Sequence, residues 1–394
     1  MLSRSDSASW PLAAAPEHVA GTLGQVFPVA ARALGRDLVS GGQLPDLLEG
    51  TAPGSLRGVV VLLVDGLGAK LLREQTAYLR FLRKSVPTAC TLHTSFPSTT
   101  TTALAYLGTG QLAGATGMAG YTARNPETGK LAQFIKWEEL PSPEQWQTAP
   151  QYLQLFERAG GQVSRVGQKK FAASDLSRAM LWTDTYHLAY RGPERVTAAL
   201  NAVGRGTKDR PALVYLYWGE LDKIGHRHGT DSFEWGQALS DLDGTVADLV
   251  NGLPKGTGLL LTADHGMIRP NLAAQIDIAS EPQLNQGLTL VGGEPRALHL
   301  YCAPEDAPEV AARWRNRLEH RAQVFTRAEA VDQGWFGQVR PEIAGALGEV
   351  VVAMTEDFTV VDSRIHTPEA RALLGAHGSL TAAETEVPLL WFAK

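Results

Sequence analysis

Short apolar runs alternate with stretches of helical periodicity along most of the chain. The clearest run, residues 59–64 between Gly58 and Gly66, holds only β-branched and aliphatic side chains, which is typical of a central strand covered on both faces. A helical pattern follows at residues 69–84. The alternation recurs later, with apolar strand candidates at 162–166, 212–218, 258–262, 350–354 and 387–392 and helical patterns at 151–159, 194–203, 233–253 and 308–321. It predicts an α/β fold in which helices flank a mostly parallel central sheet on both faces.

Two stretches depart from this alternation. Residues 121–137 hold two extended pieces around Asn125, Pro126 and Gly129, a pattern that predicts a hairpin over one end of the sheet. Residues 270–347 lie between two core segments and hold a strand and several helices of their own. We therefore expect three parts, namely an N-terminal arm at 1–50, a core at 51–269 and 348–394, and a small inserted subdomain at 270–347.

Composition narrows the classes of function. The 394 residues are 44% hydrophobic and 20% charged, as in an ordinary globular protein. Acidic residues outnumber basic ones, 41 to 36, which leaves no surplus of positive charge to hold a nucleic-acid polymer. Two cysteines supply no disulfide framework, no apolar run approaches the roughly 20 residues of a membrane-spanning helix, and the first forty residues lack a secretion signal. We expect a cytoplasmic protein without a membrane partner, and the sequence leaves its oligomeric state open.

Acidic residues and histidines follow three of the predicted central strands. Asp65 follows the strand at 59–64, and a pair of such residues follows each of two later strands. Because functional groups gather at the carboxyl ends of the strands in an open parallel sheet, we expect these side chains to share one edge. His377 precedes the last strand and can reach the same edge. The later pairs are Asp222 with His226 after 212–218 and Asp264 with His265 after 258–262.

These six side chains suit a metal centre. Carboxylates and imidazoles are ligands for zinc or manganese, and three histidines argue against magnesium, which prefers oxygen ligands. Asp222 and His226 are four residues apart, so both project from one face of a helical turn. Six ligands suffice for two divalent ions. Three carboxylates then leave about one net positive charge, which matches a singly negative phosphodiester.

A cluster of hydroxyl residues offers a nucleophile. Ser98 and residues 99–102, all threonines, precede a helical pattern at 103–107. Backbone N–H groups and the helix dipole at such a position favour an anion, and a metal ion lowers the pKa of a bound hydroxyl. A threonine alkoxide is therefore a candidate nucleophile. His299, in contrast, lies in an apolar strand pattern, and we expect it to be a hydrogen-bonded core or interface residue and not a ligand.

In order and spacing, these motifs resemble those of the alkaline phosphatase superfamily, and within it the type I phosphodiesterase and nucleotide pyrophosphatase branch. The resemblance covers most of the chain and implies an alkaline-phosphatase-like fold, a phosphoric ester hydrolase activity and a small phosphate ester or nucleotide as substrate. The motifs are Val64-Asp65-Gly66, a hydroxyl residue opening the helix before Gly108-Thr109-Gly110, residues 220–226, residues 262–267 and His377-Gly378.

The resemblance also implies roles for single residues. Two divalent ions, zinc or alternatively manganese, would each have three protein ligands, and the nucleophile would bridge both ions. The family's spacing back from Thr109 selects Thr100 as this nucleophile, whereas alignment on Phe96-Pro97 selects Ser95. We prefer Thr100 because a helix fixes its spacing and a loop need not. The two ligand sets are Asp65, Asp264 and His265, and Asp222, His226 and His377.

Substrate preference is less defined. Tyr121 stands where the family usually carries an Asn that contacts a phosphate oxygen, and a phenol donates only one hydrogen bond. Arg124 is a second candidate for substrate binding, because Arg pairs with phosphate oxygens. A phosphomonoesterase, a phosphonate hydrolase and a phosphotransferase of the phosphoglycerate mutase or phosphopentomutase type stay open, as does a binding protein of this fold. The mutase would need a cluster of Arg or Lys, and none stands beside the motifs.

Overall fold

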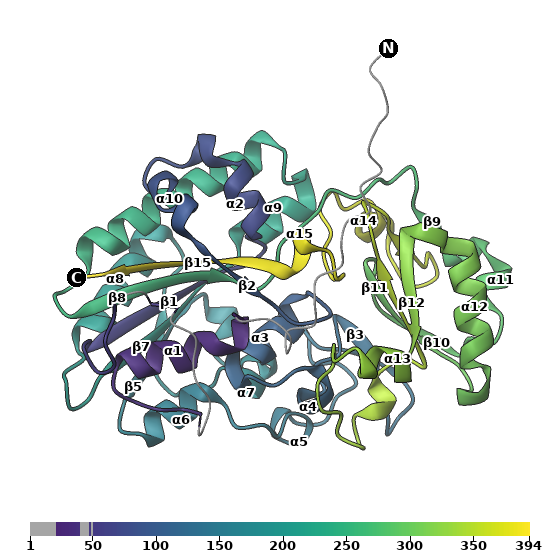
Figure 1. Ribbon diagram of the computed structural model, residues 1–394, viewed down its shortest axis with the longest axis horizontal. Helices are drawn as coiled ribbons and strands as arrows, with labels where there is room; N and C mark the ends of the chain where they lie inside the picture. Colours follow the sequence, from purple (N-terminus) through teal and green to yellow (C-terminus); the bar gives the residue numbers. More distant parts are fainter. Residues whose placement is uncertain (1–20, 40–46, 49) are drawn as a thin grey trace, which may run out of the picture.

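A seven-stranded sheet forms the centre of the computed structural model, which describes residues 21–39, 47–48 and 50–394 (Figure 1). The strand order is β2-β15-β8-β1-β7-β5-β6. β1 pairs in parallel with β7 and β8, β5 pairs in parallel with β7 and β6, and β15 runs antiparallel to β8 and β2. The bounds are β1 (Gly58–Val64), β2 (Cys90–His93), β5 (Gln162–Gly167), β6 (Tyr186–Leu188), β7 (Ala212–Trp218), β8 (Thr257–Ala263) and β15 (Glu386–Ala393).

Helices cover both faces of this sheet. Every residue of β1 is buried, which is why its sequence is apolar without alternation. Figure 1 shows α2, α9 and α10 on one side of the sheet and α1, α3, α6 and α7 on the other. The predicted mostly parallel sheet between helices is therefore confirmed. The bounds are α1 (Val26–Ala33), α2 (Ala69–Glu74), α3 (Thr100–Thr109), α6 (Tyr152–Arg158), α7 (Asp175–Met180), α9 (Glu220–His228) and α10 (Phe233–Gly252).

The helix expected at 69–84 is shorter in the structure. α2 ends at Glu74, and two 3-10 turns, Thr76–Tyr78 and Leu82–Lys84, follow it. The carboxylate of Asp243 on α10 accepts hydrogen bonds from the backbone N–H groups of residues 80, 81 and 82, each at 2.8 Å. These three bonds hold the segment in a turn, so a contact between distant parts of the chain overrides the local helical pattern.

A second, antiparallel sheet lies beside the first, with the order β10-β11-β13-β12 and with α12 (Ala307–Leu318) packed against it (Figure 1). The apolar run at 350–354, which the pattern placed with the central strands, is β13 of this sheet instead. It pairs with β11 and β12, and a strand buried on both faces looks the same in sequence in either sheet. The boundaries 270–347 of the insertion stay a prediction. The strands are β10 (Leu290–Glu294), β11 (Ala297–Tyr301), β12 (Ala322–Thr326) and β13 (Val350–Met354).

The hairpin predicted at 121–137 is present as β3 (Thr122–Arg124) and β4 (Leu131–Gln133). Thr122 ties it to the second sheet, because its hydroxyl donates to the carbonyl oxygen of Gly293 at 2.9 Å and accepts from the Gly293 N–H at 3.0 Å. The hairpin therefore packs against β10 of the second sheet. Of the predicted N-terminal arm, residues 1–20, 40–46 and 49 lie outside the described residues.

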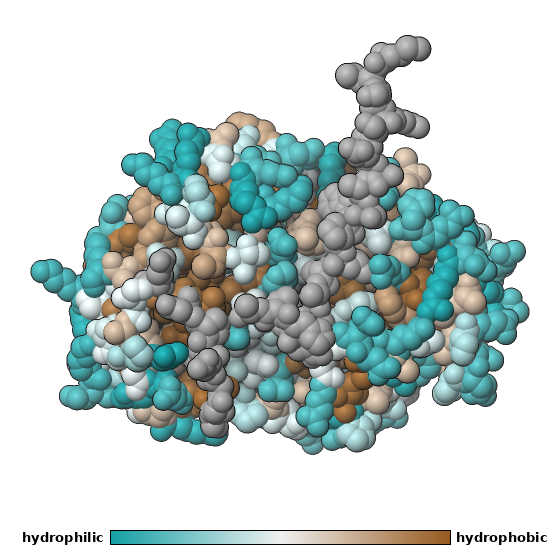
Figure 2. Space-filling view, in the orientation of Figure 1, coloured by the Kyte–Doolittle hydropathy of each residue, from teal (hydrophilic) through white to brown (hydrophobic). Residues whose placement is uncertain are grey.

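Figure 2 shows the polarity of one face of the molecule. Hydrophilic side chains cover the outer helices at the top and at the right edge, and hydrophobic side chains show mostly near the middle. Among the described residues, no helix combines the length and the apolar character that crossing a membrane requires.

Candidate active site

Three neighbouring strands deliver most of the candidate ligands to one edge of the central sheet. Asp65 follows β1, and Asp264 with His265 follows β8, the strand beside it. Asp222 and His226 lie on α9, which begins directly after β7 on the other side of β1. The structure thus places these residues at the carboxyl ends of parallel strands, where the sequence argument expected them.

Asp65, Asp264 and His265 form a compact buried group, with one possible ligand atom from each residue lying within 4.8 Å of the others. The His265 Nε2 lies 3.3 Å from Asp65 Oδ1 and 3.6 Å from Asp264 Oδ2. The N–H groups of Gly66 and His265 donate to Asp264 Oδ1 and fix that carboxylate. Asp65 Oδ1 and Asp264 Oδ2 are buried and have no hydrogen-bond partner among the described residues. Two carboxylate oxygens are therefore free for a cation.

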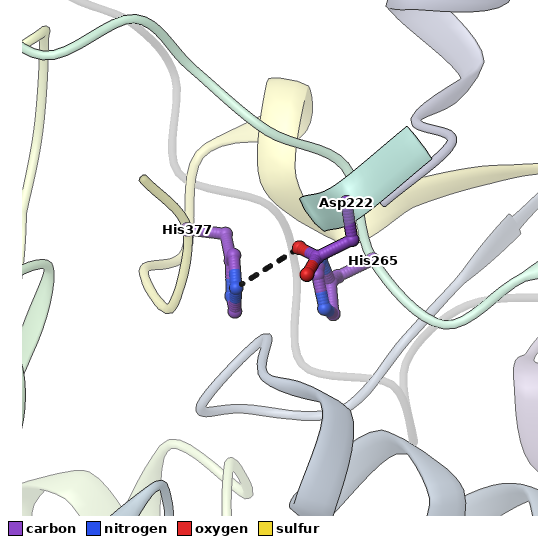
Figure 3. A group of neighbouring side chains, drawn as sticks. All are labelled: Asp222, His265 and His377. Atoms are coloured by element: carbon purple, nitrogen blue, oxygen red, sulfur yellow. Dashed lines mark ion pairs between the residues drawn. The ribbon is translucent and has the colours of Figure 1, made fainter. Parts of the chain in front are cut away.

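A second group joins Asp222, His265 and His377, again with possible ligand atoms within 4.8 Å of one another (Figure 3). The His377 Nε2 lies 3.7 Å from Asp222 Oδ1, and the rings of His265 and His377 stack at 3.7 Å. His226, which the sequence argument placed in this set, is also adjacent, because its Nε2 lies 3.2 Å from both Asp222 Oδ1 and His377 Nε2. His265 therefore lies between the two groups.

All three histidines are oriented by backbone carbonyls. The Nδ1 atoms of His226, His265 and His377 lie 2.8, 2.9 and 3.0 Å from the carbonyl oxygens of Gly375, Gly266 and Ser98. A carbonyl only accepts, so each Nδ1 carries the proton and each Nε2 turns its lone pair toward the carboxylates. Metal-binding histidines are usually held in this way, and here the Nε2 atoms of His226 and His377 lie 3.2 Å apart.

Burial makes this collection of charges unstable without a cation. Burial raises the pKa of Asp65 and Asp264, and a second carboxylate raises each further, Asp222 for Asp65 and Asp65 for Asp264. Burial lowers the pKa of His265, but Asp264 and Asp65 outweigh it and raise that pKa to about 10. Burial and the neighbouring His265 lower the pKa of His377. Divalent cations would offset the repulsion between the buried carboxylates and the cost of burying them. The donor set therefore fits metal ions.

Thr100 is the hydroxyl residue that the structure brings to this cluster. It is the first residue of α3, and its Oγ1 lies 3.2 Å from His265 Nε2. The free N–H groups and dipole of this helix start favour negative charge there. Ser95, the alternative, is fully buried, and no hydrogen bond joins its Oγ to another described residue. The contact with His265 therefore favours Thr100.

Tyr121 and Arg124 have other partners. The phenol oxygen of Tyr121 accepts a hydrogen bond from Gln133 Nε2 at 3.0 Å, and burial, with Glu294, raises its pKa. Arg124 pairs with Glu349 at 2.9 Å and lies over the ring of Tyr301. Among the contacts of the described residues, none joins Arg124 to the candidate metal ligands. Its guanidinium instead connects the hairpin to Glu349 and Tyr301. Its role in binding substrate stays a prediction, as does that of Tyr121.

The sequence argument missed several side chains at the site. The Tyr217 hydroxyl donates to Asp65 Oδ2. The carboxylate of Glu294 on β10 lies 3.7 Å from His377 Nδ1, and burial raises the pKa of Glu294 to about 8. A pocket of about 380 Å³ extends from Asp65 and Thr100 to Arg165. Only Arg165 had a visible signal in the sequence, namely a charged residue inside an apolar strand pattern.

The fold and the site together define an α/β protein with a buried candidate metal centre at the carboxyl edge of a parallel sheet. The sequence profile of one family, described as type I phosphodiesterase / nucleotide pyrophosphatase, matches residues 59–380. The chain therefore belongs to this family of phosphoric ester hydrolases within the alkaline phosphatase superfamily, as its motifs predicted.

Individual relatives match over shorter stretches. Human ectonucleotide pyrophosphatase/phosphodiesterase family member 1 is 30% identical over 142 residues, which are 34% of this chain and 15% of the relative. Rat family member 7 is 34% identical over 73 residues, which are 17% of each protein. The matched stretches thus span about a sixth of the length of these relatives.

Solved structures share the fold. Murine ectonucleotide pyrophosphatase/phosphodiesterase 5 superposes with a TM-score of 0.67 at 20% identity, covering 86% of this chain and 88% of that one. An inactive form of the same murine protein, in complex with AMP, gives 0.67 at 19% identity, with the same coverage. Phosphonoacetate hydrolase from Sinorhizobium meliloti 1021, in complex with phosphonoformate, gives 0.65 at 18% identity, covering 87% and 92%. These similarities support the fold.

Proposed function

We propose that the protein is a metal-dependent phosphodiesterase or nucleotide pyrophosphatase-like hydrolase that works through a covalent phosphothreonine at Thr100. One observation carries the proposal. The Thr100 Oγ1 lies at a helix N-terminus, 3.2 Å from His265 Nε2, beside two groups of largely buried carboxylates and imidazoles. The family match over residues 59–380 supports the reaction class.

The donor set indicates which residues would hold the ions. Asp65, Asp264 and His265 would hold one ion, and Asp222, His226 and His377 the other. Three imidazoles among six ligands favour zinc, with manganese as the alternative. When bound, the two ions would supply Lewis-acid stabilisation of phosphate oxygens and lower the pKa of a hydroxyl group.

The residues of the chain account for the remaining steps. Thr100 Oγ1, after its proton has passed to water, attacks phosphorus, so that a bond from Oγ1 to phosphorus forms and the bond to the leaving alkoxide breaks. The N-terminus of α3 stabilises the negative charge that gathers on the phosphoryl oxygens. Water then attacks the phosphorus of the phosphothreonine on the side opposite Thr100 Oγ1, the bond from Oγ1 to phosphorus breaks, and the Thr100 hydroxyl is restored. The leaving group takes a proton from water, which balances the reaction.

The charge and size of the site favour a diester. Three carboxylates against two divalent ions leave about one positive charge, which suits a singly negative phosphodiester better than a dianionic monoester. The pocket of about 380 Å³ beside Thr100 has room for a large ester substituent. Nucleotides fit this description, and the similar murine structure in complex with AMP adds support. A compact phosphonate would leave most of the pocket unfilled.

Parallel assays of bis-p-nitrophenyl phosphate and p-nitrophenyl phosphate test the proposal. We expect the metal-replete protein to hydrolyse the diester faster than the monoester and to lose this activity after chelation. Thr100→Ala should lower kcat by about 10³-fold or more, whereas Ser95→Ala, the matched control at the alternative hydroxyl, should keep it. Full activity of Thr100→Ala, or metal-independent turnover, would reject the proposal.

A further inference from the structure

We propose that the pocket beside Thr100 takes an ester substituent ending in a second anionic group, a carboxylate or a phosphate, and that Arg165 binds this group. The inference rests on the proposed function, because it concerns the substrate of the same site. It goes further in assigning the far end of the substrate a charge and a protein partner.

The pocket has two chemically different ends. Asp65, Thr100 and Asp222 line the end at the candidate metal centre, and Arg165 lines the pocket farther along. Much of the remaining lining is aromatic or aliphatic, and its further charged members are the exposed Lys170 and Lys223 and the Arg195–Glu220 pair. Aromatic walls favour a flat or apolar middle section of a ligand. The ligand that fits is therefore charged at both ends and apolar between them.

Arg165 is a buried cation without a carboxylate partner. It lies on β5 with an exposed fraction of 3%. Its Nη1 and Nη2 donate to the carbonyl oxygens of Phe171 and Ala172 at 3.4 and 2.7 Å, and its guanidinium lies over the rings of Trp182 and Tyr186. Its Nε, like that of Arg195, is buried and has no hydrogen-bond partner in the part of the chain that the structure describes. No ion pair among the described residues includes Arg165.

Arg195, in the same pocket, provides an internal comparison. It is equally buried, at 2%, but its two terminal nitrogens donate to the two carboxylate oxygens of Glu220 at 2.9 and 2.6 Å. A buried guanidinium is normally paired in this way, because an uncompensated charge away from water is costly. Carbonyl dipoles and aromatic faces compensate Arg165 only in part, so an anionic group of the ligand would complete its pairing.

The sheet sets the length of the ligand. β5 lies two strands from β1 in the order β1-β7-β5, which is about 10 Å across the sheet. In the strand register, Arg165 is paired with Tyr215 of β7, which is paired with Val61 of β1. Val61 lies four residues before Asp65. These are backbone spacings, and the guanidinium of Arg165 lies against Tyr186 of β6, on the side of β5 away from β1, so we expect the second anion to lie well away from the reacting phosphorus. An extended phosphodiester of nucleotide size meets this requirement, and a phosphonate with its carboxylate next to phosphorus does not.

A matched pair of substrates tests this inference on the unmodified protein. The probes are two p-nitrophenyl phosphodiesters whose second ester group is 4-(2-carboxyethyl)phenyl or the corresponding carboxamide, which differ only in the terminal charge. We expect kcat/KM to favour the carboxylate by about ten- to hundredfold, mostly through KM, because a charge-assisted hydrogen bond is gained at Arg165. Equal kcat/KM values for both diesters would overturn the inference while leaving the proposed function intact. Absence of turnover of both diesters would reject the proposed function itself.

Variants assign the preference to Arg165. Arg165→Gln should lose the preference for the carboxylate but still hydrolyse the carboxamide, and Arg165→Lys, which keeps the charge, should retain part of the preference. Lys169→Gln is the matched control, because Lys169 is exposed nearby and does not line the pocket. Unfolding midpoints show whether each variant is folded, and Arg165→Lys with the substrate pair carries the test if Arg165→Gln does not fold. An undiminished preference in a folded Arg165→Gln would overturn the assignment.

Discussion

Single side chains at the site gain their properties from burial and from the backbone. The Nδ1 atoms of three histidines face carbonyl oxygens, so their Nε2 atoms converge on three aspartates that the sequence places after strands. Asp222 illustrates the result. Burial raises its pKa, but His226 and His377 more than offset this, so its pKa is lowered and the carboxylate stays ionised. An ionised, partly buried carboxylate between imidazoles is suited to bind a cation.

Asp222→Asn should therefore remove most of one bound ion per chain. An amide is a neutral and weaker ligand, and both His226 and His377 lose their charged neighbour. Elemental analysis of the purified variant, together with diester hydrolysis, measures the effect, and we expect activity to fall at least 10²-fold. Full metal content with full activity would contradict the ligand assignment.

His299 behaves differently, because it is a core residue, as the apolar pattern around it predicted. Its Nε2 donates to the Ala119 carbonyl at 2.7 Å and its Nδ1 accepts from the Gly348 N–H at 3.1 Å. Burial lowers its pKa to about 4, so the unfolded chain binds the proton more tightly than the folded one. Stability should fall as pH drops from about 6.5 to 4, by up to about 3 kcal/mol from this residue.

Chemical denaturation across this pH range checks the prediction. His299→Gln keeps hydrogen-bonding groups but cannot titrate, so its stability should depend less on pH than that of the unmodified protein. An identical pH dependence in both proteins would show that His299 does not contribute.

Among the helices, α3 positions Thr100 at its N-terminus, because its C-terminal end packs closely against α7. Gly108 in this helix lies against α7, and a Cβ atom there would lie 2.1 Å from the carbonyl oxygen of Met180. Gly110, with φ +70°, then ends the helix in the left-handed conformation. The Gly108-Thr109-Gly110 motif thus has a structural reason. Gly108 lets α3 approach α7 closely, and Gly110 ends the helix.

Gly108→Ala should lower the free energy of unfolding by about 1–3 kcal/mol and reduce activity, because α3 must shift and carry Thr100 with it. Gly244→Ala on α10 is the control. No atom lies within 4 Å of a Cβ at that position, so the better helix propensity of Ala should leave stability equal or slightly higher. Denaturant titration of both variants measures the difference, and equal stability of the two would contradict the packing argument.

At the scale of the whole molecule, a buried ion pair joins the second sheet to the central sheet. Arg296, just before β11, contacts Glu384 in the short helix before β15, with Nη2 to Oε2 at 2.6 Å and Nε to Oε1 at 3.0 Å. Both side chains have an exposed fraction of 0%. Glu384 Oε1 also accepts from the Ser379 N–H, close to His377. The pair therefore connects the second sheet to the loop that delivers a candidate ligand.

Glu384→Gln should destabilise the protein by about 3–5 kcal/mol, because Arg296 would be left as an unpaired buried charge. The double variant Arg296→Met/Glu384→Leu should recover much of this loss, since it removes both charges together. Unfolding curves of the unmodified protein and the variants form the test. A loss in the double variant that equals or exceeds that in Glu384→Gln would contradict the pairing argument.

The sequence predicted those features that depend on local pattern. Continuous apolar runs such as residues 59–64 predicted strands, and the positions directly after these strands identified most of the candidate ligands. What depends on distant contacts was not predictable. The apolar run at 350–354 carries no sign of which sheet it joins, and the helix expected at 69–84 is shortened by Asp243 from a distant helix. Tyr217 reaches Asp65 because β7 pairs with β1, and Glu294 reaches His377 from β10 of the second sheet, so both contacts depend on how distant segments come together.

Acid quenching during turnover of bis-p-nitrophenyl phosphate, followed by peptide mass spectrometry, tests the central claim most directly. We expect a nitrophenyl phosphoryl group on Thr100, located by fragmentation within residues 99–102, in the metal-replete protein and not in the chelated protein or in Thr100→Ala. Labelling of Ser95 in place of Thr100, or undiminished turnover by Thr100→Ala, would contradict it.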